Sequence, residues 1–428
     1  GFLLKKKFMF LLGSYLPHAS ANGVCAEKIA QALITRGNEV CCLAMARYED
    51  PGYEEIDGVK IYRVKNLWHV RVLDWCDRHS TLPCIGILRS AALWSWRIRR
   101  LLFFFSWPLS APLFAWNFYR RAKQICLDNQ IDCIIGVYQP FESLFALMLL
   151  KKYLPYVNAV SYFCDCLSGG VFPCILPSVF CKQMLRKWEL HFFDVFDAMI
   201  VLKSHEQYYC RLYANTDTTR KIHISDIPFI ENALMEKLPI YQEKHYMSSL
   251  VYAGSINMPL TDPRYMLEIF TMMDKSCIKL DIYGRNNCGF LFEDKSEGDL
   301  SGSLNIHSAL PHNEILPLLL NADILLNLGS NNPRQIPSKI FEYMALGKPI
   351  ISFYKYNEEP SIEYLNKYPL ALLIKEDWDK IGDNAAIVET FIREKRGMRV
   401  PFSEVEALFP QNTPEYTAKL LIEICGGE

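Results

Sequence analysis

Short, uninterrupted apolar runs alternate with segments of helical periodicity along most of this chain. In the clearest case the apolar run 8–12 is followed by a helical pattern at 24–35, which Gly37 ends, and by a second apolar run at 39–43. Continuous apolar runs are typical of parallel strands covered on both faces, and consecutive parallel strands need crossover helices between them. The alternation therefore predicts α/β structure, in which helices begin at the carboxyl edge of a parallel sheet.

The alternation occurs in two series, which predicts two doubly wound domains. Further strands of the first series are expected at 60–64, 133–137, 159–163 and 198–202. After a polar stretch at 231–248 the second series is expected to contain strands 249–253, 279–283, 304–307, 323–328, 349–353 and 370–374, and helices 263–274, 313–321, 337–346, 361–367 and 378–394. A length of 428 residues leaves room for about two to three domains. We predict an N-terminal domain over 1–235, a C-terminal domain over 246–405 and a last helix within 406–428.

Composition and charge narrow the class of protein. The chain is 50% hydrophobic and 22% charged, which is typical of a globular protein. Its net charge is −1, whereas a dedicated nucleic-acid-binding protein is expected to be strongly basic. The 15 cysteines are scattered and odd in number, which indicates free thiols in a reducing compartment. The densest cysteine group lacks the paired spacing of a zinc site, so no metal is predicted there: Cys164, Cys166, Cys174 and Cys181.

Three lysines, Lys5, Lys6 and Lys7, precede the first apolar run in the manner of a signal peptide. The run has only five residues before Gly13, fewer than the roughly 7–15 of an apolar signal core. A buried first strand is therefore the better interpretation. Together with the free thiols, this favours a cytoplasmic protein.

Residues 67–121 interrupt the alternation and include an uncharged run at 101–118, rich in Phe, Trp and Leu. The run has basic flanks on both sides: Arg97, Arg99 and Arg100 before it, and Arg120 and Arg121 after it. Its 18 residues are near the lower limit for a membrane-spanning helix, and equal positive flanks give no orientation signal. Two internal prolines favour a segment that enters one leaflet, with a buried helical hairpin and a spanning helix as alternatives. We therefore predict a peripheral protein at the inner face of the membrane.

The segment 333–349 contains the most informative helix. Pro337 suits its first turn, and Gly347 followed by Pro349 ends it. Ser338, Lys339 and Glu342 lie three and four residues apart, away from the apolar stripe. A helix start at the carboxyl edge of a sheet favours a phosphate, and a carboxylate one turn deeper can accept hydrogen bonds from two ribose hydroxyls. The alternative is a solvated Lys–Glu pair on a surface helix.

The same segment resembles the donor site of a known enzyme family. Residues 336–351, IPSKIFEYMALGKPII, are similar to the donor-site segment of the retaining GT-B-fold glycosyltransferases of family 4, many of which build bacterial surface polysaccharides. Weaker similarities extend over nearly the whole chain, at 22–40, 250–254, 280–284 and 322–326. The resemblance implies two facing Rossmann-like domains, a nucleotide sugar in the cleft between them, and a C-terminal helix that returns to the first domain.

Three positions depart from the family pattern. Arg334 stands where a Glu is usual, eight residues before Glu342, and Tyr138 stands where a His is common. Residues 255–257 lack the usual Arg and Lys, so phosphate binding is expected to rest on Lys339, Arg285 or Arg334.

The resemblance also implies roles for individual residues. Those expected to be catalytic are Lys339, Glu342 and Asp165. Those expected to bind the donor are Gly13, Gly23, Gly254, Arg285, Arg334, Ser338, Lys339 and Glu342. Those expected to bind the acceptor are His18, Tyr138 and Asp165, although His18 could be an ordinary surface residue and Asp165 could cap a loop.

These expectations define a function. We expect transfer of a sugar from a nucleoside-diphosphate sugar to a hydroxyl of a glycan or lipid-linked glycan in polysaccharide biosynthesis, with retention implied by the resemblance. A sugar-nucleotide epimerase or hydrolase of the same fold and a non-catalytic nucleotide-sugar-binding protein are the alternatives. The sequence lacks a phosphate-binding P-loop and the three-glycine dinucleotide fingerprint, which argues against an NTPase and an NAD enzyme. Asp377 and Asp379 match a short metal-binding pattern but lie at a helix start, where Asp is common, so neither metal nor cofactor is predicted.

Overall fold

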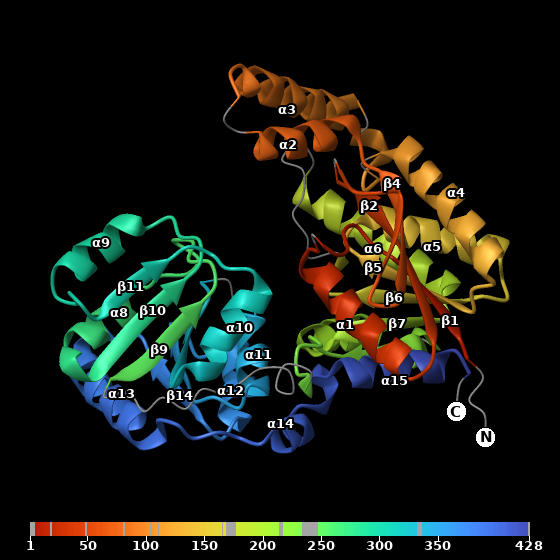
Figure 1. Ribbon diagram of the computed structural model, residues 1–428. Helices are drawn as coiled ribbons and strands as arrows, with labels where there is room; N and C mark the ends of the chain where they lie inside the picture. Colours follow the sequence, from red (N-terminus) through yellow and green to blue (C-terminus); the bar gives the residue numbers. More distant parts are fainter. Residues whose placement is uncertain are drawn as a thin grey trace. The chain divides into compact units, whose positions relative to one another are not determined.

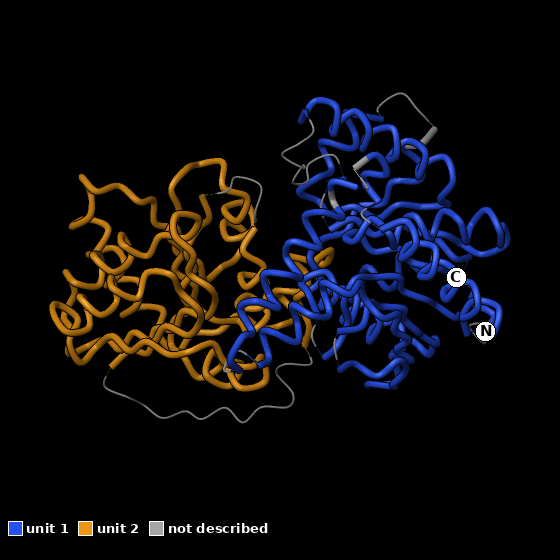
Figure 2. The backbone as a smooth tube through the Cα atoms, turned by 90° about the horizontal axis from the view of Figure 1, so that it is seen from above, with its two compact units in different colours: residues 1–228, 414–428 blue, residues 229–413 orange. Residues whose placement is uncertain are grey.

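The computed structural model describes residues 5–17, 19–47, 49–79, 82–102, 104–109, 111–164, 166–167, 177–213, 217–232, 247–331 and 336–426. The chain divides into two compact units (Figure 2). Unit 1 comprises Gly1–Pro228 and Pro414–Glu428, and unit 2 comprises Phe229–Thr413. Each unit is built on one sheet. All strand pairs of unit 2 are parallel, and all but one of those in unit 1 are parallel.

Unit 1 contains an eight-stranded sheet in the order β3-β4-β2-β1-β5-β6-β7-β8 (Figure 1). Its strands are β1 (Lys7–Leu11), β2 (Glu39–Ala46), β3 (Tyr53–Ile56), β4 (Val59–Lys65), β5 (Cys133–Tyr138), β6 (Asn158–Phe163), β7 (Ala198–Leu202) and β8 (Ile222–Ser225). All neighbours pair in parallel except β3 and β4, which form an antiparallel hairpin. Asp57 and Gly58 connect that hairpin and both have positive φ, as a two-residue turn between antiparallel strands requires.

The helices of unit 1 cover this sheet, and the last of them comes from the C-terminus. They are α1 (Ala21–Thr35), α2 (Trp68–Arg78), α3 (Ile85–Leu102), α4 (Pro112–Asn129), α5 (Phe141–Tyr153), α6 (Ser178–Val195), α7 (Glu206–Leu212) and α15 (Pro414–Ile424). Helix α15 packs on α1, where Arg36 and Glu415 form an ion pair of 2.8 Å. The expected return of the C-terminal helix to the first domain is therefore confirmed.

The uncharged run at 101–118 does not form one element. Helix α3 ends at Leu102 and α4 begins at Pro112, so the run is divided near its two prolines. Phe114 and Phe118 lie in the core of unit 1, whereas Leu101, Leu102 and Phe105 are exposed. Among the described residues no helix is both long enough and apolar enough to cross a membrane. Phe103, within the same run, lies outside the described residues.

Unit 2 contains a six-stranded sheet in the order β11-β10-β9-β12-β13-β14, and every pair is parallel. Its strands are β9 (Ser248–Ala253), β10 (Ile278–Tyr283), β11 (Leu304–His307), β12 (Ile324–Leu328), β13 (Ile350–Tyr354) and β14 (Ala371–Lys375). Its helices are α8 (Arg264–Thr271), α9 (Gly289–Glu297), α10 (His312–Asn321), α11 (Lys339–Ala345), α12 (Ser361–Lys367), α13 (Ile381–Lys395) and α14 (Phe402–Leu408). The chain builds outward from β9 in one direction and then in the other, which is the doubly wound arrangement predicted from the sequence.

Gly347 allows the turn that follows α11. Its φ is +68°, and a Cβ at this position would lie 2.3 Å from the backbone oxygen of Val400. We expect Gly347→Ala to lower the free energy of unfolding by about 2 kcal/mol or more. The cost of a left-handed backbone at alanine adds to the cost of the clash with the Val400 backbone. Urea denaturation followed by circular dichroism measures this loss.

Gly397 provides the matched control for this prediction. It also has a positive φ, +75°, but a Cβ there would meet nothing within 4 Å. Gly397→Ala should therefore lower the free energy of unfolding by only about 1 kcal/mol, the cost of a left-handed backbone at alanine. Equal losses in the two variants would contradict the role assigned to the Val400 contact.

Candidate functional site

A cavity of about 290 Å³ lies at the carboxyl edge of the unit 2 sheet. Three segments line it: the end of β9 with its turn, the end of β12, and the residues that lead into α11. The lining residues are Tyr252, Ala253, Gly254, Ser255, Thr261, Leu328, Ser330, Ile336, Pro337, Ser338 and Lys339. The cavity is at the β9–β12 boundary, where the strand order reverses and where α/β sheets bind their ligands.

Lys339 brings a cation into this cavity. Its Nζ lies 3.7 Å from the centroid of the Tyr252 ring. Burial of the amine lowers the pKa of Lys339 to about 7, because an enclosed ammonium loses its hydration. The ring opposes this effect, since a cation over an aromatic face gains about 0.5–2 kcal/mol. No described carboxylate pairs with Lys339, so its charge is available to a ligand.

Gly254 keeps the space in front of this amine open. The residue ends β9 with a φ of +147°, and a Cβ there would lie 3.0 Å from Lys339 Nζ. The turn after β10 packs against it, since a Cβ on Gly284 would lie 2.0 Å from the Gly254 oxygen. Arg285 follows on that turn and is exposed, but it does not line the cavity.

Glu342 lies one turn after Lys339 on α11 and forms an ion pair with His312 at the start of α10. The Glu342 side chain retains 19% of its exposure, and that of His312 retains 57%. The Lys339–Glu342 surface pair, which was the alternative interpretation of this helix, is not among the ion pairs of the described residues. Sequence reasoning did not identify His312, because the contact joins two helices that begin 27 residues apart.

Tyr343 attaches α11 to the end of β9. Its hydroxyl accepts a hydrogen bond from Ala253 N at 3.1 Å and donates one to Ala253 O at 3.3 Å. The side chain is fully buried. This double contact fixes Lys339 and Gly254 relative to each other. Ser338, which precedes the helix, is exposed and makes no capping hydrogen bond.

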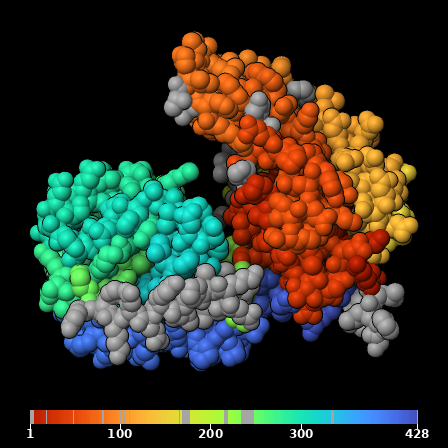
Figure 3. All heavy atoms as spheres, in the orientation of Figure 1, coloured from red at the N-terminus to blue at the C-terminus, as the bar shows by residue number. Residues whose placement is uncertain are grey.

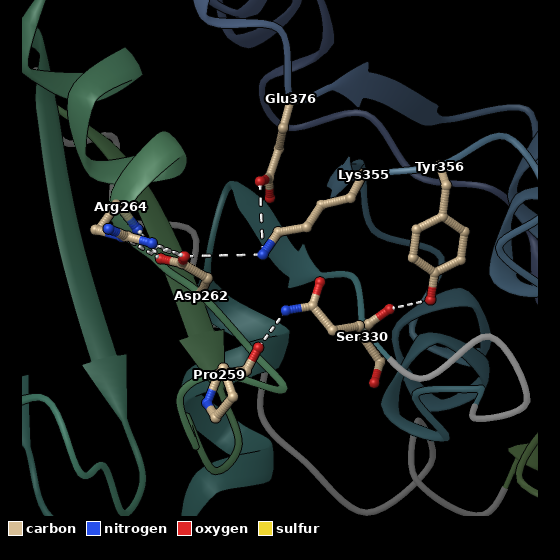
Figure 4. Close-up of polar contacts among 8 residues, drawn as sticks. Pro259, Asp262, Arg264, Ser330, Lys355, Tyr356 and Glu376 are labelled. Atoms are coloured by element: carbon tan, nitrogen blue, oxygen red, sulfur yellow. Dashed lines mark hydrogen bonds and ion pairs between the residues drawn. The ribbon is translucent and has the colours of Figure 1, made fainter.

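Polar contacts connect the loops around the cavity (Figure 4). Asn331 joins the loop after β12 to the loop after β9, since its backbone N–H donates to Leu260 O at 2.7 Å and its side chain donates to Pro259 O. Tyr356, from the loop after β13, donates to Ser330 O. The loops that line the cavity are therefore held by each other as well as by the strands.

An ionic cluster lies beside these loops. Lys355 Nζ is 3.8 Å from a carboxylate oxygen of Asp262 and 3.9 Å from one of Glu376 (Figure 4). Arg264 makes a second, shorter pair with Asp262, at 2.6 Å, and hydrogen bonds from Arg264 lower the pKa of Asp262. Burial raises the pKa of Glu376 to about 7. The charges of this cluster are matched internally, which favours a structural role.

Three of the residues predicted from the sequence lie together in unit 1. Gly13 follows β1, and a Cβ there would lie 3.0 Å from Pro140 Cδ. Gly23 lies in the first turn of α1, where a Cβ would lie 2.3 Å from Ser14 O. The carbonyl of Tyr138, at the end of β5, accepts a hydrogen bond from Asn22 Nδ2 at 3.0 Å. The structure thus brings Gly13, Gly23 and Tyr138 to one edge of the first sheet.

The remaining predicted residues, His18, Asp165 and Arg334, lie outside the described residues. The structure adds a buried acid that the sequence did not single out. Glu142 is 5% exposed in the first turn of α5. Burial lowers the pKa of Arg99 on α3, and the carboxylate of Glu142 opposes part of that shift.

Comparisons with known proteins bear on the fold. No protein-family model and no curated protein sequence matches this chain. Among solved structures, a glycosyltransferase from Rickettsia africae matches with a TM-score of 0.62 at 11% identity, covering 98% of this chain and 99% of that chain. HepE from Anabaena, in complex with UDP, matches with a TM-score of 0.52 at 13% identity, covering 98% of this chain and 97% of that chain. The catalytic domain of starch synthase IV from Arabidopsis thaliana, bound to ADP and acarbose, matches with a TM-score of 0.56 at 8% identity, covering 99% of both chains.

The double contact of the Tyr343 hydroxyl generates a prediction. Tyr343→Phe should lower the free energy of unfolding by about 1–3 kcal/mol, because the Ala253 N–H loses its partner in a buried place. Thermal and urea unfolding of the purified variant measure the loss. Tyr354→Phe is the control, since the described residues offer the Tyr354 hydroxyl no partner. Equal stability of the two variants would contradict the role of Tyr343.

Proposed function

We propose that this chain, which has the GT-B fold, is a glycosyltransferase that uses a nucleoside-diphosphate sugar as donor. The observation that carries the proposal is Lys339, a basic side chain without a described carboxylate partner, in the cavity where the strand order reverses. Proteins of the same fold bind UDP or ADP in their solved structures. The acceptor in this proposal is a hydroxyl of a glycan or lipid-linked glycan in polysaccharide biosynthesis, and transfer retains the anomeric configuration.

The donor diphosphate lies against Lys339 in this proposal, with Ser338 and the open side of Gly254 beside it. Negative charge grows on the diphosphate as the sugar departs, so a preorganised cation there stabilises the transition state more than the bound donor. Glu342 accepts hydrogen bonds from the ribose hydroxyls, and His312 orients its carboxylate. Arg285 and Arg334 are the further cations proposed to contact the phosphates.

Unit 1 supplies the acceptor side of the proposed reaction. Tyr138 ends β5 at the carboxyl edge of its sheet, and His18 and Asp165 follow β1 and β6 in the sequence. Gly13 and Gly23 lie at the same edge and are proposed to contact the donor. A hydroxyl of the acceptor would be bound at this edge.

We also propose that helix α3 attaches the protein to the cytoplasmic face of a membrane. Five large apolar side chains of α3 are more than half exposed and follow helical spacing along one face: Ile87, Trp94, Ile98, Leu101 and Leu102. The helix contains four arginines and no acidic residue. Figure 3 shows this segment in orange at the surface of unit 1. An apolar stripe bordered by arginines suits the interface of an anionic bilayer.

The transferase proposal predicts nucleoside diphosphate release that depends on a glycan acceptor. Screening UDP- and ADP-sugars with candidate lipid-linked and soluble glycans, with mass detection of the product, tests this directly.

Glu342→Ala should weaken donor binding roughly 10- to 100-fold, because charge-assisted hydrogen bonds to the ribose are lost. Glu363→Ala is the matched control, since Glu363 is exposed on another short helix, α12, and pairs with Lys367.

Release without any acceptor would indicate a hydrolase, and binding without turnover would indicate a non-catalytic protein. Unchanged calorimetric affinity in Glu342→Ala would show that the ribose lies elsewhere.

The membrane proposal predicts cosedimentation with anionic vesicles that weakens as salt is raised, because arginine contacts are screened. The triple variant Trp94→Ser, Leu102→Ser, Phe105→Ser removes side chains that are 60%, 62% and 73% exposed, and it should abolish most of the binding. The control triple Tyr156→Ser, Phe290→Ser, Ile387→Ser removes scattered exposed side chains and should bind normally. Undiminished binding of the first triple variant would exclude α3 and the turn that follows it as the attachment site.

A further inference from the structure

Among the described lysines of unit 2, Lys348 is buried and Lys339 is half-buried, and the surroundings of their amines differ. Lys348 is 5% exposed, and its Nζ donates a hydrogen bond to Ala322 O at 2.6 Å. Lys339 has only the Tyr252 ring, 3.7 Å away, and no hydrogen bond or ion pair is recorded for its Nζ among the described residues. Lys348 thus has a structural partner, whereas Lys339 lines the cavity at the carboxyl end of β9.

Three acidic groups on the elements around Lys339 have partners other than Lys339, although Glu359 Oε2 is buried without a hydrogen-bond partner among the described residues. Glu342, on its own helix, pairs with His312. Asp262, in the loop after β9, pairs with Arg264 and Lys355. Glu359, in the loop after β13, accepts a hydrogen bond from the Ser361 hydroxyl at 2.6 Å. Residues 332–335 contain no acidic side chain in the sequence.

The remaining neighbours of the amine are neutral. Burial raises the pKa values of Tyr252 and Tyr343, so both phenols stay protonated. The other lining residues carry aliphatic side chains, hydroxyls or no side chain. An ammonium in this place therefore loses hydration and gains only the face of one aromatic ring.

We propose that the Lys339 amine is neutral in the free protein and takes up one proton from solvent when a diphosphate binds against it. The step is R–NH₂ + H⁺ → R–NH₃⁺, with no bond to the ligand formed and no other group changed. The negative charge of the ligand supplies the partner that the protein withholds. This inference rests on the proposed donor site and adds that donor binding is coupled to protonation.

The coupling has a definite sign. Burial lowers the pKa of Lys339 to about 7 in the free protein, and a bound diphosphate would raise it. Below pH 7 the amine is already charged, so diphosphate binding takes up few protons. Above pH 7 each bound diphosphate takes up close to one proton, so affinity falls about tenfold per pH unit. A lysine with an ordinary pKa near 10.4 would show no such slope below pH 9.

Competitive acetylation of the full chain measures the titration of individual lysines. Trace acetic anhydride reacts only with neutral amines, and mass spectrometry of the peptides gives the reactivity of each lysine between pH 6 and 10. We expect half-maximal reactivity of Lys339 near pH 7 in the free protein and above pH 9 with saturating UDP or ADP. Lys380, whose side chain is 69% exposed, is the internal reference, and its reactivity profile should be the same with and without the nucleotide.

Calorimetry provides the second measurement. Between pH 7.5 and 9 the phosphates of ADP are fully ionised, so only the protein titrates. Affinity of the parent for the nucleoside diphosphate that binds should fall about thirtyfold over this range. Lys339→Arg keeps its charge throughout and should change less than threefold. Thermal unfolding of Lys339→Arg and of Lys339→Met shows that both variants remain folded.

Each result has a distinct meaning. If Lys339 titrates near pH 10 in the free protein, the proposal is overturned, and a bound nucleoside diphosphate would leave the transferase assignment intact. If it titrates near 7 and UDP or ADP binds with a flat pH profile, the coupling alone is overturned. If it titrates near 7 and neither nucleotide binds at any pH, the coupling and the proposed donor site are both wrong.

Discussion

Six parallel strands bring all their carboxyl ends to one edge of the unit 2 sheet, and this constraint determines where a ligand can bind. Beyond β9 the chain continues on one side of the sheet and then on the other, so the loops after β9 and β12 diverge. The gap between them is the cavity, and α11 begins beside it. The turn after β10 approaches the turn after β9 so closely that only glycine fits at Gly284, and a Cβ on Gly254 would lie 3.0 Å from Lys339 Nζ.

Ionisable side chains in the interior of this structure differ in whether the protein supplies a hydrogen-bond partner. Glu189, in unit 1, is fully buried, and burial raises its pKa to about 7, but the Tyr213 hydroxyl donates a hydrogen bond to it at 3.3 Å. Lys348 likewise has a carbonyl partner. Such groups are anchored by the fold that encloses them. Lys339 has neither arrangement, although enclosing a cation without a partner is unfavourable. A group of this kind is explained by a ligand better than by packing.

Much of the fold could be predicted from the sequence because buried parallel strands are continuous apolar runs. The strands at 198–202 and 304–307 agree with β7 and β11 at both ends. Elements with weaker apolar patterns were missed: β3 is an exposed edge strand, and α9 follows the polar segment at 285–288. The Asp57-Gly58 turn was nevertheless a legible hairpin signal. The run at 101–118 is divided between the end of α3 and the start of α4, and hydrophobicity alone does not show where one helix ends and the next begins.

For the candidate site, the sequence located the segment but not its surroundings. Lys339, Ser338 and Gly254 do line one cavity, since local motifs bring chemistry to a helix start and to a strand end. The partner of Glu342 could not be inferred, because the contact with His312 depends on how α10 and α11 lie across β9 and β12. The enclosure of the Lys339 amine was equally hidden, since it depends on the ring of Tyr252 two residues before a glycine turn.

The missing cations at 255–257 and the state of Lys339 are two aspects of one electrostatic problem. A donor site needs positive charge when the diphosphate is present, and several permanent cations in an enclosed cavity would repel each other when it is absent. With no Arg or Lys at 255–257, Lys339 is the cation that lines the cavity within the described part of the chain. An amine that ionises only with its ligand avoids burying an unpaired charge in the free protein. Arginine could not serve in this way, because its guanidinium stays protonated. The choice of lysine at this position, together with a neutral aromatic neighbour in place of a carboxylate, is consistent with a site whose charge is completed by what it binds.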